Sequence, residues 1–134
     1  MITLEKARQA ITAAKQKAIE LNILITIAIV DEHGKIIALE RMDNALTVSP
    51  DFALAKAYTS ATLRIPTETL SHYAIEGKPY FGLSQMSNGQ FNIIAGGLPV
   101  KVEENIVGGV GVGGSTDVNQ DVQCAQVAVN VLEN

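Results

Sequence analysis

The chain has 134 residues, a formal net charge of −4 and 47% apolar residues, and only 4% of its residues are aromatic. Its ten basic residues form no run, which argues against nucleic acid as the main partner. No apolar run approaches the roughly 20 residues of a membrane helix, and no signal peptide is visible at the start. The single Cys124 can form no internal disulfide, which suits a reducing compartment. We therefore expect one domain, residues 1–134, in the cytoplasm, with no nucleic-acid or membrane partner.

The first elements expected along the chain are a helix and a hairpin. Thr3 can cap a helix over Leu4–Leu21, where apolar residues recur every three or four positions. The almost wholly apolar run Leu24–Val30 predicts a strand covered on both faces. Asp31–Gly34 predicts a tight turn, and Lys35–Arg41 is then the partner strand of a hairpin.

The middle of the chain is predicted to be helical and then irregular. The segment Ser49–Asp51 predicts the start of a helix over Pro50–Arg64. It places Ser at the cap, Pro at the first helical position and an acidic residue next. This helix should stop before Pro66. A short helix is expected over Thr67–Glu76, followed by an irregular segment over Tyr80–Gly89.

Three more strands and a helix are predicted in the last third. Phe91–Ala95, Leu98–Glu103 and Ile106–Gly113 are the expected third, fourth and fifth strands. Thr116 or Asn119 can cap a final helix with an apolar stripe. Because the connections are short, the pairing should be mostly antiparallel, and strands apolar on both sides need helices on both faces. The predicted fold is an α/β (α+β) protein, a profilin-like three-layer α/β/α sandwich around a five-stranded sheet.

Alternate glycines leave one face of the last predicted strand without side chains. Gly109, Gly111 and Gly113 share this face, while Val110 and Val112 lie on the other. Such a face is expected where another group approaches the backbone, and both a helix contact and a binding surface explain it. The same residues satisfy G-x-G-x-x-G, but inside a strand rather than at a strand-to-helix turn, so a dinucleotide site is not predicted.

Several segments together resemble the GlcG/HbpS family of haem-binding or haem-degrading-type domains, which also forms the C-terminal part of PduO-type corrinoid adenosyltransferases. They are Val30–Gly34, Arg41–Asp43, Ala55–Thr59, Gly96–Val100, Gly108–Ser115 and Gln120–Asp121. The resemblance covers nearly the whole chain. It implies a profilin-like fold, assembly into homo-oligomers, and an association with haem, corrinoids or glycolate and diol catabolism. The turn at Glu103–Asn105 departs from the Asp-Gly-like pair expected there.

Haem bound non-covalently needs an axial His, Met, Cys or Tyr. His72, beside Tyr73 on the predicted short helix, is better placed than His33, which lies in the hairpin turn. Two His and one Cys far apart show no zinc-ligand spacing, so no metal site other than haem is expected.

Lys56 and Arg41 are the charged residues most suited to holding an anionic ligand. Lys56 sits among apolar helix residues and is either a surface lysine or a cation for a carboxylate, with Arg41 as a second donor. Asp43 could instead pair with Arg41. With the glycines of the resembling segments, the candidate ligand-binding residues are Arg41, Asp43, Lys56, Gly96, Gly97 and Gly111. No catalytic residue can be named from spacing.

Three functions fit these observations. The first is an oligomeric binding domain for a small ligand, with haem, a corrinoid or a small organic acid as candidates. The second is an enzyme or accessory subunit acting on a small hydroxy or oxo acid, with Lys56 and Arg41 holding the substrate. The third is a purely structural subunit.

Overall fold

The computed structural model describes residues 1–134 and contains one antiparallel sheet of four strands in the order β2-β1-β4-β3. The strands are β1 (Thr26–Asp31), β2 (Ile36–Arg41), β3 (Gly97–Val102) and β4 (Asn105–Gly113). The apolar strands β1 and β4 therefore occupy the centre of the sheet, as their buried side chains require.

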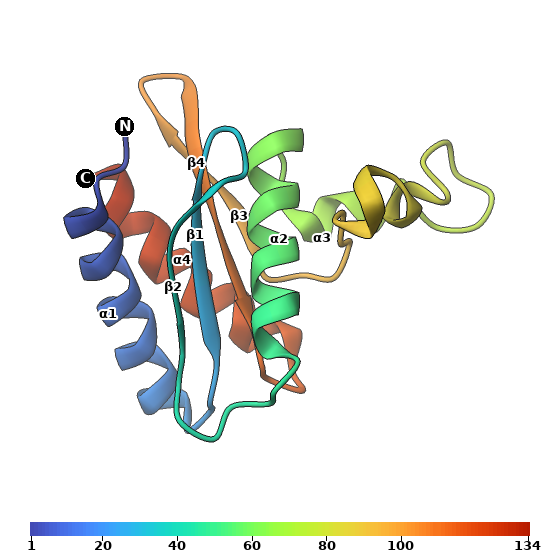
Figure 1. The fold of residues 1–134 in the computed structure, drawn as a ribbon. Coiled ribbons are helices and arrows are strands. Elements are labelled where there is room, and N and C mark those ends of the chain that lie inside the picture. The colour runs from blue at the N-terminus through green and yellow to red at the C-terminus, as the bar shows by residue number, and fades with distance from the viewer.

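Helices cover both faces of this sheet, so the molecule has three layers (Figure 1). The helices α1 (Leu4–Leu21) and α4 (Val118–Glu133) pack side by side on one face, over the main apolar core. The helix α2 (Ser49–Leu63) lies alone on the other face, mainly against β4 and β1. This confirms the predicted α+β architecture with an antiparallel sheet. No helix combines the length and the apolar character that crossing a membrane demands.

The expected five-stranded sheet was wrong, because Phe91–Ala95 forms no strand. Side chains take the place of a neighbouring strand there: the Asn92 N–H donates to Thr59 Oγ1 at 2.9 Å, and the Ile94 N–H donates to Asn92 Oδ1 at 2.8 Å. The segment therefore runs along α2 without joining the sheet.

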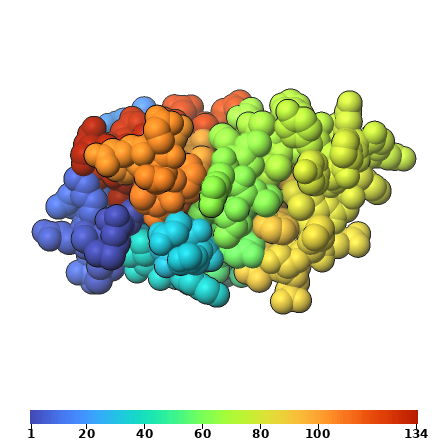
Figure 2. Space-filling model, turned by 90° about the horizontal axis from the view of Figure 1, so that it is seen from above, coloured from blue at the N-terminus to red at the C-terminus, as the bar shows by residue number.

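The expected helix over Thr67–Glu76 is also shorter in the structure. The helix α3 covers only Thr67–Leu70, and a series of turns with two 3₁₀ segments, η1 (Leu83–Gln85) and η2 (Ser87–Gly89), follows it. Residues 71–92, called the arm below, project from the sandwich beyond α3 (Figure 1; the yellow end in Figure 2).

Two expected details at the ends of elements were wrong. The helix α2 begins at Ser49 itself, because the Ser49 hydroxyl is engaged with Leu46 O and Thr26 Oγ1 instead of capping. The last helix is capped by Asp117, whose carboxylate accepts from the Asn119 N–H at 3.0 Å. The β3–β4 hairpin turns through Glu103 and Glu104, both with positive φ (50° and 69°), which is the conformation that an Asp-Gly-like pair normally supplies.

Candidate functional site

The glycine face of β4 is covered by helix α2. A Cβ atom at Gly109 would lie 2.6 Å from the Ala57 carbonyl oxygen, and one at Gly111 would overlap the Ala53 carbonyl oxygen. The backbones of β4 and α2 can approach this closely only because the strand has no side chains there. Of the two explanations, the structure therefore shows the helix contact, and α2 occupies the space next to Gly111.

This close approach buries Lys56, which points from α2 past the end of β4. Lys56 is only 2% exposed, so it is not a surface lysine. Its Nζ donates to the Val112 carbonyl oxygen at 2.8 Å and to Asp121 Oδ2 at 3.4 Å. Space for the ammonium group exists because a Cβ at Gly96 would lie 2.8 Å from Nζ. A Cβ at Gly97 would lie 2.5 Å from the Lys56 carbonyl oxygen.

The partner of Lys56 is Asp121, in the first turn of α4. It is 1% exposed, and its Oδ1 accepts from the Ser115 N–H at 3.2 Å. Asp121 was not among the expected ligand-binding residues, because the sequence marks it only as part of the segment Gln120–Asp121. A usable signal was its spacing: Asp121 precedes the buried Cys124 and Ala125 by three and four residues, on the stripe that faces the core.

Burial acts on the protonation of both partners. It lowers the pKa of Lys56 below its ordinary value, and the charge of Asp121 offsets only part of this effect. Burial also raises the pKa of Asp121, against the opposing influence of Lys56 and of the Ser115 N–H. Both groups thus shift toward their neutral forms, and a proton can pass between them along the existing contact.

The pair borders a cavity of about 200 Å³, called the Lys56 hollow below. Besides Lys56 and Asp121, the residues that line it are apolar or small: Leu46, Phe52, Ile94, Gly113, Gly114, Ser115 and Val118. An ammonium group carries three N–H donors, and Val112 and Asp121 accept two of them. The third donor of Lys56 has no acceptor within the chain.

Arg41 and Asp43 lie apart from this pair. Arg41 is exposed at the end of β2, where its guanidinium donates to the Ala45 carbonyl oxygen at 3.1 Å. Asp43 is exposed and forms no ion pair with Arg41. Neither residue lines the Lys56 hollow. Of the candidates from the sequence, the structure therefore brings together Lys56, Gly96 and Gly97.

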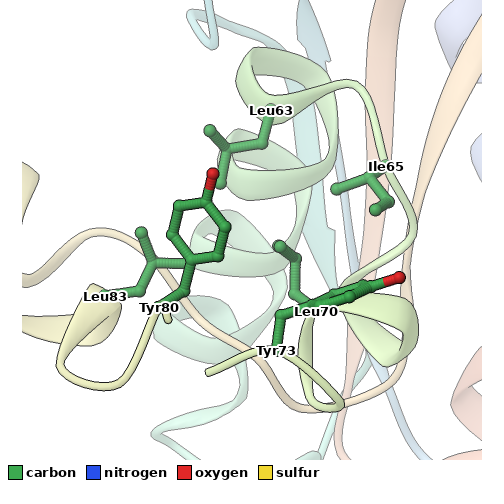
Figure 3. A pocket seen from close by; sticks show the side chains of 6 residues that line it. All are labelled: Leu63, Ile65, Leu70, Tyr73, Tyr80 and Leu83. Carbon is green, nitrogen blue, oxygen red and sulfur yellow. The ribbon is translucent and has the colours of Figure 1, made fainter. Parts of the chain in front are cut away.

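A second cavity, of about 350 Å³, lies between the arm and the end of α2 and is called the arm hollow below. Six apolar or aromatic side chains line it, as Figure 3 shows: Leu63, Ile65, Leu70, Tyr73, Tyr80 and Leu83. The phenol group of Tyr80 points toward Leu63 at the end of α2 (Figure 3). His72 is exposed on the arm next to Tyr73 and is not among the lining residues.

Other residues with metal-binding side chains are dispersed. No group of three or more His, Cys, Asp or Glu side chains is gathered where it could hold a metal ion. Cys124 is buried in the core, and burial raises the pKa of its thiol to about 11. The thiolate form needed for metal binding is therefore strongly disfavoured at Cys124.

Comparison with known proteins finds a family model and relatives that match nearly the whole chain. Residues 2–130 match the family model described as haem-degrading protein HbpS-like. A 15.0 kDa protein from the dhaT–dhaS intergenic region of Citrobacter freundii is 36% identical over 96% of this chain and 90% of its own length.

Two further matches are to PduO proteins. The corrinoid adenosyltransferase PduO of Salmonella typhimurium is 32% identical over 92% of this chain, but the match covers only 37% of that enzyme. The crystal structure of a complex between PduOC and haem superimposes with a TM-score of 0.90 at 29% identity, covering 97% of this chain and 96% of that one.

Proposed function

The chain belongs to the family of HbpS-like haem-degrading proteins, and from this we propose that it is a small-ligand-binding domain whose ligand is haem. The observation that carries the proposal is the arm hollow, a cavity walled by apolar and aromatic side chains alone. An apolar cavity of this kind suits the faces of a large conjugated ring, and its volume lies at the lower end for ligand sites. The similarity to a solved haem complex supports the same ligand.

The residues around the arm hollow fit the chemistry of haem. Tyr73 and Tyr80 line it, and a phenol oxygen is one of the atoms that bind haem iron in proteins. Lys78 is exposed on the arm between the lining residues Tyr73 and Tyr80 and can pair with a propionate. His72, on the same segment, remains the proposed alternative to the tyrosines as axial ligand. Bound haem would supply an iron centre, while these side chains bind and orient the ring.

We propose further that a second copy of the chain covers the arm. Large apolar side chains of the arm are exposed: Tyr73 47%, Ile75 48%, Tyr80 58%, Phe81 66% and Met86 61%. Large apolar side chains exposed together on one segment mark an interaction surface more often than open solvent contact. Because Tyr73 and Tyr80 belong both to this surface and to the arm hollow, the second copy would also close the ligand site.

Haem titration followed by absorbance tests the proposed function. The wild-type protein should give a saturable Soret band at one haem per chain, and cobalamin added in its place should show whether a corrinoid competes. Replacing His72 by Ala, with the exposed His33→Ala as its matched control, and replacing Tyr73 and Tyr80 by Phe one at a time, identifies the axial ligand. A wild-type protein that leaves the haem spectrum unchanged at all ratios would overturn the proposal.

A further inference from the structure

The Lys56 hollow lies away from the arm hollow, and no lining residue is shared between them. Its floor holds a buried amine and a buried carboxyl group that contact each other at 3.4 Å. Its rim is apolar and partly open, with Leu46 58%, Ile94 43% and Val118 37% exposed. The rim is thus open to solvent, and a small molecule that enters the hollow would meet Lys56 and Asp121, which are 2% and 1% exposed, at its floor.

A purely structural role would explain the pair poorly. A buried ion pair that only joins two helices is often no more stable than an apolar pair of the same size. Such a pair should also be sealed and fully hydrogen-bonded, since each unsatisfied buried group is costly. Here the pair borders a cavity, and the Lys56 amine makes two of its three possible hydrogen bonds within the chain.

The charges on the floor indicate which ligands it suits. Lys56 and Asp121 together carry no net charge, so an anion close to the amine also meets the repulsion of the carboxylate. A neutral carbonyl group needs only the free donor. The volume of about 200 Å³ limits the ligand to a few carbon atoms, whose apolar part can lie against Phe52 and Ile94. The matching class is small aldehydes and ketones.

We propose that Lys56 is a carbonyl-reactive amine that forms a reversible iminium adduct with small aldehydes or ketones, and that Asp121 transfers the proton this requires. Both groups line the floor of the Lys56 hollow, where they would touch the carbonyl group of a bound molecule. Nothing in this proposal depends on haem or on the arm.

The chemistry balances without a further reagent. The Lys56 ammonium gives a proton to the Asp121 carboxylate, and the free amine nitrogen bonds to the carbonyl carbon while one of its own protons moves to the carbonyl oxygen. The hydroxyl group of the resulting carbinolamine takes a second proton from Asp121 and leaves as water while the C=N bond forms. The products are one iminium cation, one carboxylate and one water, and hydrolysis reverses the sequence.

The electrostatics of the pair favour this sequence. A lysine that is desolvated in an apolar site loses its proton more readily than a solvated one, which leaves more of its amine in the nucleophilic form. The raised pKa of Asp121 lets its carboxyl group hold a proton more readily than an exposed one does.

Reductive trapping of the wild-type protein tests the proposal. Propanal and cyanoborohydride are added at pH 6.5, and the modified residues are mapped by mass spectrometry over time. Lys56 should be modified ahead of the exposed Lys35 and Lys78, since each unit by which a lysine pKa falls gives about tenfold more free amine. Modification of Lys35 and Lys78 with Lys56 left untouched would overturn the proposal.

The role of Asp121 is tested with a matched pair of variants. Asp121→Asn should slow the trapping at Lys56 until it is no faster than the trapping at Lys35. The circular dichroism spectrum should be unchanged. Asp117→Asn, four residues earlier on the same helix end, keeps a good capping residue and should trap as the wild type does. Equal trapping in Asp121→Asn and the wild type would remove Asp121 from the proposal.

Discussion

The burial of Lys56 follows from its glycine neighbours. Because Gly111 has no side chain, α2 lies directly on β4, and because Gly96 has none, the ammonium group fits beside the Val112 carbonyl. The cation is then held by Asp121, which approaches from the opposite layer of the sandwich. A lysine that composition alone assigns to the surface thus becomes one of the most buried side chains in the protein.

Removing the amine should destabilise the protein more at high pH than at low pH. In Lys56→Met the Asp121 carboxylate loses its cation, so its already raised pKa rises further above the unfolded value. An acid whose pKa is higher in the folded than in the unfolded protein lowers the stability progressively as the pH rises from the unfolded-state pKa to the folded-state pKa. Relative to wild type, the free energy of unfolding should therefore fall by about 3 kcal/mol at pH 8 and by less at pH 5.

Urea unfolding at the two pH values measures this difference. Lys78→Met, on the exposed arm, is the control and should cost little at either pH. A loss in Lys56→Met that is the same at pH 5 and pH 8 would show that Asp121 does not respond to the amine.

Among the helices and strands, local signals predicted most elements correctly. Thr3 accepts from the Lys6 N–H and begins α1 at the expected residue, and Asp31 accepts from the N–H groups of His33 and Lys35 in the expected hairpin turn. These signals depend on residues a few positions apart, so the sequence contains them directly.

Long-range partners could not be predicted in the same way. Phe91–Ala95 has the apolar pattern of a strand, but its backbone bonds to Thr59, 33 residues away from Asn92 in sequence. Lys56 and Asp121 are 65 positions apart, and no local pattern shows that they meet. Arg41 and Asp43 were expected beside Lys56, but neither lines the Lys56 hollow. Their distance from it in space could not be seen in the sequence either.

The contact between β4 and α2 should not tolerate a side chain at Gly111. A methyl group there overlaps the backbone of Ala53, so Gly111→Ala should lower the free energy of unfolding by about 3 kcal/mol or more. Gly77→Ala is the control, since no atom lies within 4 Å and only its positive φ opposes the change, at about 1 kcal/mol. Equal costs in urea unfolding would show that α2 can move away from the strand.

Over the molecule as a whole, the arm divides the structure into two kinds of surface. The sandwich packs the main apolar core between its layers, and the arm presents several large apolar side chains to solvent within one short segment. The arm is tied back to α2 through Tyr58, which bonds Ser87 at 2.6 Å and whose ring centroid lies 5.5 Å from that of Phe91, and through Thr59, which accepts from the Asn92 N–H. A fixed arm with an apolar surface is suited to hold a second copy of the chain.

The protein should therefore self-associate in solution. Light scattering at micromolar concentration should give a particle larger than the 14.2 kDa chain. Phe81→Ser, which removes the most exposed aromatic ring of the arm, should lower the mass toward that of the single chain, while the exposed Glu76→Ser should leave it unchanged. A wild-type particle of 14.2 kDa would contradict self-association.

The most direct test of the account is haem titration of two matched Leu→Glu variants. Leu63 lines the arm hollow and Leu46 lines the Lys56 hollow, and both are partly exposed, so each substitution should leave the fold intact. If haem occupies the arm hollow, Leu63→Glu should weaken binding by about tenfold or more, because it places an unpaired charge against an apolar ring. Leu46→Glu should bind haem as the wild type does. Equal affinities in Leu63→Glu and the wild type, or a loss confined to Leu46→Glu, would contradict the proposed site.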